Sequence, residues 1–397
     1  LETDRTYEES YDKLVLSPGA APIVPPLPGV DLPGVFTLRN LPDMDRIKAF
    51  VDEEKPARAV VVGGGFIGLE IAENLQHRGV QVTLIELLNQ VMAPIDPEMA
   101  ALVHQHLIFK KVRLALGDGL KSIGTGEDGW LKVGLNSGRT VDAEMAILSI
   151  GVRPENRLAK EADLELGVRG TIRVNSHMQT SDPDIYAVGD VVEVINRITD
   201  EPTNMALAGP ASRQGRMVAD HITGRDVSFK GVVGTSVVKV FDLTVSAVGL
   251  NTHQLEQAEM EFMNVIVHVS NHAGYYPGAS PMALKLLFSP EGKIFGAQAV
   301  GIEGVEKRID VIATAMQAGM SVFDLEELEL SYAPPFGSSR DPVNIVGFTA
   351  GNVLRGDAKV MHWDQVNQLD RNAMTVVDVR LPEELGLGML DGAINIP

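Results

Sequence analysis

Residues 59–86 read AVVVGGGFIGLEIAENLQHRGVQVTLIE, and this stretch decides the fold. Residues 59–62 are four apolar residues that end on glycine, which is typical of a buried parallel strand. Apolar residues then recur at helical spacing as far as Gly79, and a second apolar run over residues 80–85 ends at Glu86. The stretch therefore predicts a strand, a helix and a second strand in one unit.

Three glycines stand between the first strand and the helix in the pattern G-x-G-x-x-G. Gly63 permits a tight turn, Gly65 lets a pyrophosphate approach the backbone, and Gly68 lets the helix lie close to the strand. The helix N-terminus directs unpaired N–H groups at the phosphates. Glu86 stands where an acidic side chain accepts hydrogen bonds from a ribose 2′-hydroxyl and repels a 2′-phosphate. The pattern predicts a site for NADH, with NADPH disfavoured; a glycine-rich structural turn is the alternative.

Composition limits the kind of protein. A chain of 397 residues predicts two to four domains. The net charge of −19 argues against nucleic acid and anionic membranes as partners, and any anionic ligand needs a local basic cluster. No apolar run reaches the roughly 18 residues of a membrane helix, and the first residues are no signal peptide, so we expect a cytoplasmic protein.

Metal and thiol chemistry have little support in the sequence. The chain has 0 cysteines, which excludes disulfides, thiolate metal sites and a cysteine nucleophile within it. Its 9 histidines lack the spacing of metal ligands, so we expect no metal site.

The segments around residues 59–86 continue the alternation of strands and helices. A short strand that runs into a glycine turn is expected at 14–22. Further strands are expected at 112–117, 130–135 and 141–151, and helices at 43–52 and 96–109. This order predicts a parallel, doubly wound sheet.

A second informative stretch covers residues 180–190. Residues 185–188 predict a strand, Gly189 allows close backbone approach, and the Asp190 carboxylate at the strand's end is placed to accept hydrogen bonds from a polyol. A helix begins near Leu207, with Pro210 in its first turn. Its N-terminus carries partial positive charge that is suited to a ring carbonyl.

The pattern changes to antiparallel strands and then helices beyond residue 231. Strands are expected at 235–240, 244–248, 262–269, 283–288 and 294–300, and helices at 308–319 and 322–328. Tyr275 and Tyr332 lie in turns that prolines make rigid, although tyrosines packed in turns are the commoner case. Lys307, Arg308 and Arg340 are candidates for a local anion site, with solvated surface charge as the alternative. After a linker from residue 357, a strand at 374–380 begins a new unit.

Three motifs in this order, residues 63–86, residues 180–190 and the terminal α+β segment, resemble the FAD-dependent pyridine nucleotide–disulfide oxidoreductases. Within that family, YYPG at 275–278, KRID at 307–310 and SYAPPF at 331–336 with RDP at 340–342 resemble the coenzyme A-disulfide reductase branch. DVR at 378–380 and GAINIP at 392–397 resemble the opening of a rhodanese domain. That fusion is similar to NADH-dependent coenzyme A-persulfide and polysulfide reductases.

The resemblance implies an α/β and α+β flavoprotein with two Rossmann-like dinucleotide-binding domains. It divides the chain into a remnant of the FAD-binding domain (1–41), an NAD(H)-binding Rossmann domain (42–151), a second part of the FAD-binding domain (152–229), an α+β dimerisation domain (230–356) and the start of an α/β rhodanese domain (357–397). The implied activity is electron transfer from NADH through FAD to a coenzyme A disulfide, persulfide or polysulfide, in a homodimer.

The resemblance also assigns roles to individual residues. The cofactor-binding residues would be Gly63, Gly65, Phe66, Gly68, Glu70 and Glu86 for NADH, and Ser17, Pro18, Gly19, Ala20, Gly189, Asp190, Leu207 and Ala208 for FAD. Gly151 would also bind a cofactor. The catalytic residues would be Tyr275 and Tyr332, which reach across the dimer interface toward the partner's reactive sulfur. The residues that contact coenzyme A would be Ser212, Arg308 and Arg340.

The sequence departs from the family in two places. The first flavin-binding glycine motif and the cysteine that follows it are absent, and so is the cysteine loop of the rhodanese domain. We therefore expect a chain truncated at both ends that does not complete the reaction by itself. One alternative is an NADH oxidase or peroxidase of the same fold. The other is a non-catalytic, NADH-binding dimeric fragment.

Overall fold

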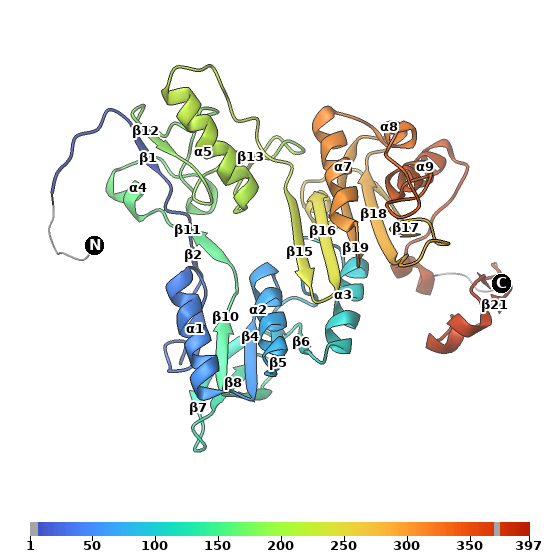
Figure 1. Cartoon of the computed structure of the whole chain (residues 1–397), viewed down its shortest axis with the longest axis horizontal. Coiled ribbons are helices and arrows are strands. Elements are labelled where there is room, and N and C mark those ends of the chain that lie inside the picture. Colours follow the sequence, from blue (N-terminus) through green and yellow to red (C-terminus); the bar gives the residue numbers. More distant parts are fainter. Residues whose placement is uncertain (1–6, 369–373) are drawn as a thin grey trace. The chain divides into compact units, whose positions relative to one another are not determined.

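The computed structural model describes residues 7–368 and 374–397. The chain divides into two compact units, one up to Gly351 and the other from Asn352. Figure 1 traces the elements of both units.

A five-stranded parallel sheet is the centre of the first unit. Its strands, in spatial order, are β3 (Val35–Thr37), β10 (Met145–Leu148), β4 (Arg58–Val62), β5 (Gln81–Glu86) and β6 (Arg113–Leu116). Three helices, α1 (Leu41–Glu54), α2 (Phe66–His77) and α3 (Pro97–Phe109), share one apolar core with this sheet. The predicted parallel sheet and the helices around 43–52 and 96–109 are thus confirmed.

The opposite face of the parallel sheet differs from a doubly wound arrangement. Val60, Val62 and Ile85 pack there against a three-stranded antiparallel sheet, not against a second layer of helices. Its strands are β7 (Leu120–Thr125), β8 (Leu131–Leu135) and β9 (Thr140–Ala143), which we call the meander. Glycines and aspartates closely spaced after Gly117 favour short strands joined by turns over a helix.

The single strand expected at 141–151 is wrong. Glu144 separates β9 from β10, because its carboxylate accepts hydrogen bonds from the backbone N–H groups of Ala57 (2.7 Å) and Arg58 (2.9 Å). One side of the break therefore joins the meander, and the other joins the parallel sheet.

A smaller group of elements flanks the parallel sheet. Strand β1 (Leu14–Leu16) pairs in parallel with β12 (Ile185–Ala187), and β2 (Ala20–Pro22) pairs in antiparallel with β11 (Val152–Pro154). The other elements are α4 (Arg157–Glu161), η1 (Val168–Gly170), β13 (Val194–Ile195), β14 (Pro202–Thr203) and α5 (Ala208–Ile222). The short strand and the glycine turn expected at 14–22 are confirmed as β1 and Gly19, which adopts φ +72°, and the chain continues after the turn as β2.

The five antiparallel strands predicted after residue 231 are confirmed. They are β15 (Thr235–Val240), β16 (Leu243–Gly249), β17 (Met263–Ser270), β18 (Pro281–Phe288) and β19 (Ile294–Gly301), in the spatial order β15-β16-β19-β18-β17. The associated helices are α6 (Thr252–Gln257), α7 (Val305–Ala318), α8 (Val322–Glu327) and α9 (Pro342–Arg355). Of these, α6 and α9 were not predicted.

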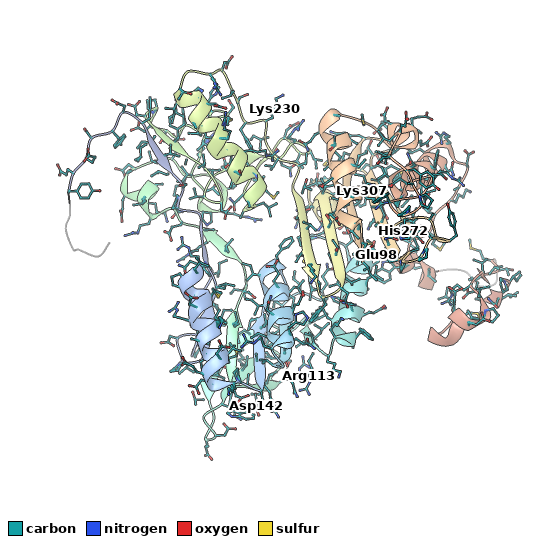
Figure 2. The ribbon with its side chains drawn as sticks, viewed as in Figure 1. Glu98, Arg113, Asp142, Lys230, His272 and Lys307 are labelled. Carbon is teal, nitrogen blue, oxygen red and sulfur yellow. The ribbon has the colours of Figure 1, made fainter. Side chains whose placement is uncertain are left out.

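A buried ionic network joins α3 to the antiparallel sheet. The Lys285 ammonium of β18 lies 2.6 Å from an Asp96 carboxylate oxygen and 2.5 Å from one of Glu98, which Figure 2 labels on α3. Asp96 also accepts hydrogen bonds from the Thr252 hydroxyl (2.8 Å) and the Gln298 amide (2.8 Å). The side chains of Lys285 and Asp96 are each only 3 % exposed. This network fixes the segment between β5 and α3.

The unit from Asn352 contains η2 (Trp363–Gln368), β20 (Val377–Asp378), η3 (Pro382–Leu387) and β21 (Ile394–Asn395). Strands β20 and β21 pair in parallel. The strand expected at 374–380 is thus confined to two residues. The Arg380 guanidinium binds the Asp378 carboxylate at 2.7 Å immediately after β20.

None of the helices in the described parts of the chain is both long and apolar enough to span a bilayer. Within the same residues, no cluster of three or more histidine, aspartate or glutamate side chains is placed to hold a metal ion.

Candidate functional site

The glycine loop lies between β4 and α2, and each glycine has a different neighbourhood. Gly63 adopts φ +110°, and a Cβ there would lie 2.2 Å from the Ser149 carbonyl oxygen. A Cβ on Gly68 would lie 1.9 Å from the Gly63 carbonyl oxygen, whereas one on Gly65 would meet nothing within 4 Å. Gly63 and Gly68 are thus required by close packing, and Gly65 leaves open space before the helix. Gly65 is also the N-cap of α2 and provides no side-chain acceptor, so the helix N-terminus keeps donors for an anion.

Glu86 stands at the carboxyl end of β5, beside the glycine loop. Its carboxylate accepts hydrogen bonds from the backbone N–H groups of Gly64 (2.7 Å) and Leu88 (2.8 Å). A carboxylate offers about four acceptor positions, so two remain for the hydroxyls of a ribose. The geometry fits the adenosine end of a dinucleotide and adds a second task for Glu86, which is to hold the loop.

One cavity of about 790 Å³ joins many of the predicted cofactor residues. Its lining includes Gly63, Gly65, Phe66, Glu86, Gly151, Asp190 and Leu207. Gly68, Glu70, Gly189, Ala208 and residues 17–20 are not part of that lining. The cavity therefore connects the glycine loop of the parallel sheet with the chain after β12 and the start of α5.

Sequence reasoning missed other residues that line this cavity. They include Leu88, Gln90, Pro94, Gly119, Asn136 and Ser149. The Asp118 carboxylate organises part of this wall, since it accepts hydrogen bonds from the Ser137 hydroxyl (2.6 Å) and the Arg139 guanidinium (2.8 Å). These contacts lower the pKa of Asp118 to about 2. No local sequence pattern marks such a wall, because its members meet only through tertiary contacts.

Strands β1 and β12 are parallel, and Leu14–Leu16 pair with Ile185–Ala187. The segments that follow these two strands are therefore neighbours. Residues 17–20 and Gly189 with Asp190 therefore lie at the same edge. Gly189 N–H donates to the Gln214 amide oxygen (2.7 Å), and the Asp190 carbonyl oxygen accepts from Asn204 (2.9 Å). Burial raises the pKa of Asp190.

The carboxylate of Asp190 has no hydrogen-bond partner among residues 7–368 and 374–397. A half-buried acceptor of this kind, which faces the cavity, fits the hydroxyls of a flavin ribitol chain. The residues present therefore fit FAD as well as NADH.

The two tyrosines predicted to be catalytic, Tyr275 and Tyr332, are 57 positions apart in the sequence but in contact in the structure. The hydroxyls of Tyr275 and Tyr332 lie 3.3 Å apart, and this hydrogen bond raises the pKa of Tyr332. Both side chains are exposed, with 77 % of Tyr275 and 46 % of Tyr332 accessible. Neither lines the 790 Å³ cavity of this chain. We name them the tyrosine pair.

The predicted basic cluster is wrong for Arg308. Its side chain is 2 % exposed, and its guanidinium binds the Asp341 carboxylate (2.9 Å) and the carbonyl oxygens of Asn271 (2.7 Å) and Gly304 (3.0 Å). These contacts occupy the donors of Arg308 inside the protein, so it is not available to a substrate anion. The other predicted coenzyme A contacts, Ser212 and Arg340, are exposed.

Comparisons with known proteins agree with this geometry. Residues 1–215 match the model of the pyridine nucleotide-disulphide oxidoreductase family, and residues 235–341 match that of its dimerisation domain. A coenzyme A disulfide reductase of Staphylococcus aureus is 36% identical over 351 residues, which are 88% of this chain and 78% of that protein.

Several solved structures are similar over most of the chain. Reduced CoADR-RHD of Bacillus anthracis is 53% identical with a TM-score of 0.95, over 99% of this chain and 71% of that one. An NAD-dependent persulfide reductase from A. fulgidus is 36% identical with a TM-score of 0.92, over 98% and 70%. A water-forming NADH oxidase from Lactobacillus brevis is 28% identical with a TM-score of 0.83, over 88% and 77%. The chain described here thus belongs to the pyridine nucleotide-disulphide oxidoreductase family.

Proposed function

We propose that this chain provides the NADH site, part of the FAD site and the dimer-forming part of a flavin-dependent reductase that acts on coenzyme A disulfides or persulfides. The observation that carries the proposal is the single cavity lined by both the glycine loop with Glu86 and by Asp190 with Leu207. An NADH site and a flavin site that share one cavity are what electron transfer between them needs. The similarity to a coenzyme A disulfide reductase and to a persulfide reductase supports the choice of acceptor.

The residues of this chain would hold the cofactors in a defined way. The N–H groups before α2 would bind the pyrophosphate of NADH, and Glu86 would bind its ribose. Asp190 would accept hydrogen bonds from the ribitol of FAD, and the N-terminus of α5, at Leu207 and Ala208, would direct partial positive charge toward the flavin ring. Bound FAD would supply two-electron transfer from NADH to the sulfur–sulfur bond. The balance is NADH, a proton and a disulfide to NAD⁺ and two thiols.

The tyrosine pair would act on the sulfur side of the reaction. A phenol held near a departing thiolate can donate its proton. A tyrosine phenol is protonated at neutral pH. The hydrogen bond with Tyr275 raises the pKa of Tyr332 and so leaves this proton in place. The match of residues 235–341 to a dimerisation domain supports a homodimer. In this dimer each tyrosine pair would serve the partner's site. The 397 residues contain no cysteine, so they do not supply the thiol of a mixed-disulfide step.

Arg340, Lys307 and Ser212 are the exposed or half-exposed candidates for contact with coenzyme A. Arginine and lysine side chains suit its phosphates, because charge-assisted hydrogen bonds to phosphate are strong. These side chains would provide the local positive charge that an anionic substrate needs on a chain of net charge −19.

A second candidate is an NADH oxidase or peroxidase of the same fold. The similarity to a water-forming NADH oxidase favours it. In this case oxygen or peroxide replaces the sulfur substrate, and the tyrosine pair has no catalytic part.

We also propose that the unit from Asn352 begins a rhodanese-like domain. Its parallel β20–β21 pair and the Asp378–Arg380 ion pair fall on the residues that resemble the start of such a domain. Limited proteolysis should cleave first near residue 357, after the boundary between the two compact units. Cleavage that starts elsewhere within either unit would contradict the proposal.

The cofactor part of the proposal is tested by NADH titration of FAD-loaded protein without oxygen. We expect the flavin absorbance to bleach, and we expect Glu86→Ala to weaken NADH binding about tenfold or more. This estimate follows from the roughly 1.5–3 kcal/mol of a hydrogen bond to a charged group. Glu127→Ala, on the exposed turn of the meander, is the matched control and should bind like wild type. Unbleached flavin would refute the cofactor assignment.

The acceptor part is tested by titration with coenzyme A and by oxygen consumption. Coenzyme A should bind, and Arg340→Ala should weaken it at least fivefold while NADH binding is retained. If coenzyme A does not bind and NADH drives rapid oxygen consumption, the oxidase is the better assignment.

A further inference from the structure

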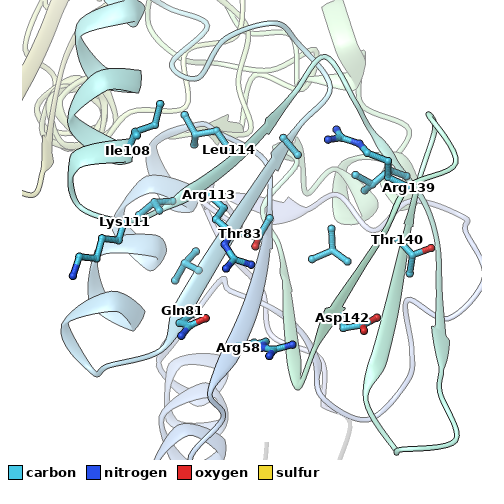
Figure 3. Close-up of a pocket in the computed structure, with 15 residues that line it drawn as sticks. Arg58, Gln81, Thr83, Ile108, Lys111, Arg113, Leu114, Arg139, Thr140 and Asp142 are labelled. Carbon is cyan, nitrogen blue, oxygen red and sulfur yellow. The ribbon is translucent and has the colours of Figure 1, made fainter.

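We propose that the parallel sheet carries a second anion site, at the opposite end from the glycine loop, which binds a small organic phosphate of about mononucleotide size. The site is a groove of about 970 Å³ between the parallel sheet and the meander. We call it the basal groove. Figure 3 shows it with the residues that line it.

Strand register places the key side chains on one face. Arg58 and Gln81 are Cα partners at the starts of β4 and β5, and Thr83 and Arg113 are Cα partners at β5 and β6. Because side chains alternate along a strand, Arg58 shares a face with Val60, which packs on the meander. Arg113 shares that face with Thr83. Two arginines therefore stand at the amino-terminal edge of the sheet, on either side of β5.

The charge balance of the basal groove is the reverse of that of the whole chain. Its lining contains four basic residues, Arg58, Lys111, Arg113 and Arg139, and one acidic residue, Asp142. Asp142 is already paired with Lys132 (3.2 Å). In the whole chain, 53 acidic residues outnumber 34 basic ones. The groove is thus a local basic cluster in a strongly acidic protein.

Three of the four cations have no ion pair within the described part of the chain, namely Arg58, Lys111 and Arg113. The fourth, Arg139, is bound to Asp118. The guanidinium carbon of Arg58 lies 4.9 Å from the centroid of the Trp130 ring. This contact orients the guanidinium without neutralising its charge. In Figure 3 the guanidinium of Arg113 lies beside Thr83, while Lys111 points away from the groove. Arg58 and Arg113 are therefore the residues placed to bind the anion.

The rest of the lining defines the chemical class of the ligand. The Thr83 and Thr140 hydroxyls and the Gln81 amide can donate to phosphate oxygens, as the arginines do. Leu114, Leu135 and Val141 provide an apolar surface for a ring or an aliphatic part. A long polyanion is disfavoured by the net charge of −19, so the ligand is small.

The test uses adenosine 5′-monophosphate as the probe, with the cofactor cavity saturated by NADH beforehand. Isothermal titration should detect one further site, and Arg113→Ala should weaken it at least tenfold, with partial recovery in Arg113→Lys. Arg58→Ala should weaken it similarly. Arg173→Ala, an exposed arginine elsewhere on the chain, is the matched control and should have no effect.

The probe's two halves are tested separately. Adenosine without its phosphate should bind at least tenfold more weakly than the monophosphate, and inorganic phosphate should also bind more weakly. If adenosine binds as tightly as the monophosphate, the groove is not an anion site. If inorganic phosphate binds as tightly as the monophosphate, the ligand need not be an organic phosphate. No binding to NADH-saturated protein, or equal loss in Arg173→Ala, would overturn the proposal as a whole. NADH affinity, unchanged in all variants, verifies that each one is folded.

Discussion

Lys285→Met should destabilise the protein more than any exchange of an exposed lysine or arginine. Methionine keeps the packing of the side-chain stem but removes the ammonium that lies 2.6 Å from Asp96 and 2.5 Å from Glu98. Asp96 is then a buried carboxylate without its cation. Loss of one partner from a buried ion pair costs about 3–5 kcal/mol of unfolding free energy.

The hydrogen bonds that Asp96 keeps in Lys285→Met reduce the expected loss of unfolding free energy. Asp96 still accepts hydrogen bonds from the Thr252 N–H (3.0 Å), the Thr252 hydroxyl and the Gln298 amide after Lys285 is lost. These dipoles partly stabilise the charge, so we expect the lower end, about 3 kcal/mol. Arg157→Met is the control, because Arg157 and Glu161 form an ion pair of 3.8 Å that is largely exposed. Such a pair contributes about 0.5 kcal/mol or less.

Urea unfolding measures both variants, followed by far-UV circular dichroism and by tryptophan fluorescence. The free energies are compared only if the two probes give one transition, since a chain of several domains can unfold in steps. Lys285→Met combined with Asp96→Asn should recover part of the loss, because the asparagine leaves no charge to bury. If Lys285→Met costs no more than Arg157→Met, or if Asp96→Asn adds its full cost to that of Lys285→Met, the buried ion pair does not stabilise the protein as expected.

The candidate site supplies three more predictions. Gly65→Ala should fold normally but bind NADH at least tenfold more weakly, whereas Gly68→Ala should lose about 1–3 kcal/mol of stability. Calorimetry measures the stability and titration measures the NADH affinity. If the two variants change both quantities equally, the two glycines do not differ in packing as described. Tyr275→Phe should lower the pKa of Tyr332 toward its usual value, and an unchanged tyrosinate titration would exclude the hydrogen bond. Because the pKa of Asp118 falls from 3.8 to about 2 on folding, its stabilisation is present above pH 4 and lost as the pH falls toward 2. Asp118→Asn should therefore reduce the slope of the unfolding free energy against pH over that range. An unchanged slope would contradict this prediction.

Features with local causes could be predicted from the sequence. The glycine loop, Glu86 and the strand before Asp190 are each determined by residues within one turn or one strand. The antiparallel strands after residue 231 were found because each is a short apolar run between turn residues. The assignment of individual site residues stays a prediction, and so do the domain boundaries.

Features with distant causes could not be predicted. Helix α9 contains Gly347 and several β-branched residues, which are weak helix formers. It is held by tertiary packing: a Cβ on Gly347 would lie 2.9 Å from the Leu325 side chain, and Val343 and Val346 are fully buried. The break at Glu144 likewise depends on Ala57 and Arg58, more than 80 residues away in the chain.

Two arginines show why charge alone does not identify an anion site. Arg308 stands next to Lys307 in a sequence that resembles a coenzyme A contact, yet its donors are satisfied by Asp341, 33 positions further along the chain. Arg113 has no such sequence context, but strand register puts it on the face of Arg58, with no carboxylate of the described residues to neutralise it. What distinguishes them is whether the fold brings a partner to the guanidinium. An arginine whose partner is absent in the fold, on a chain with 19 excess negative charges, is the better candidate for binding an anion.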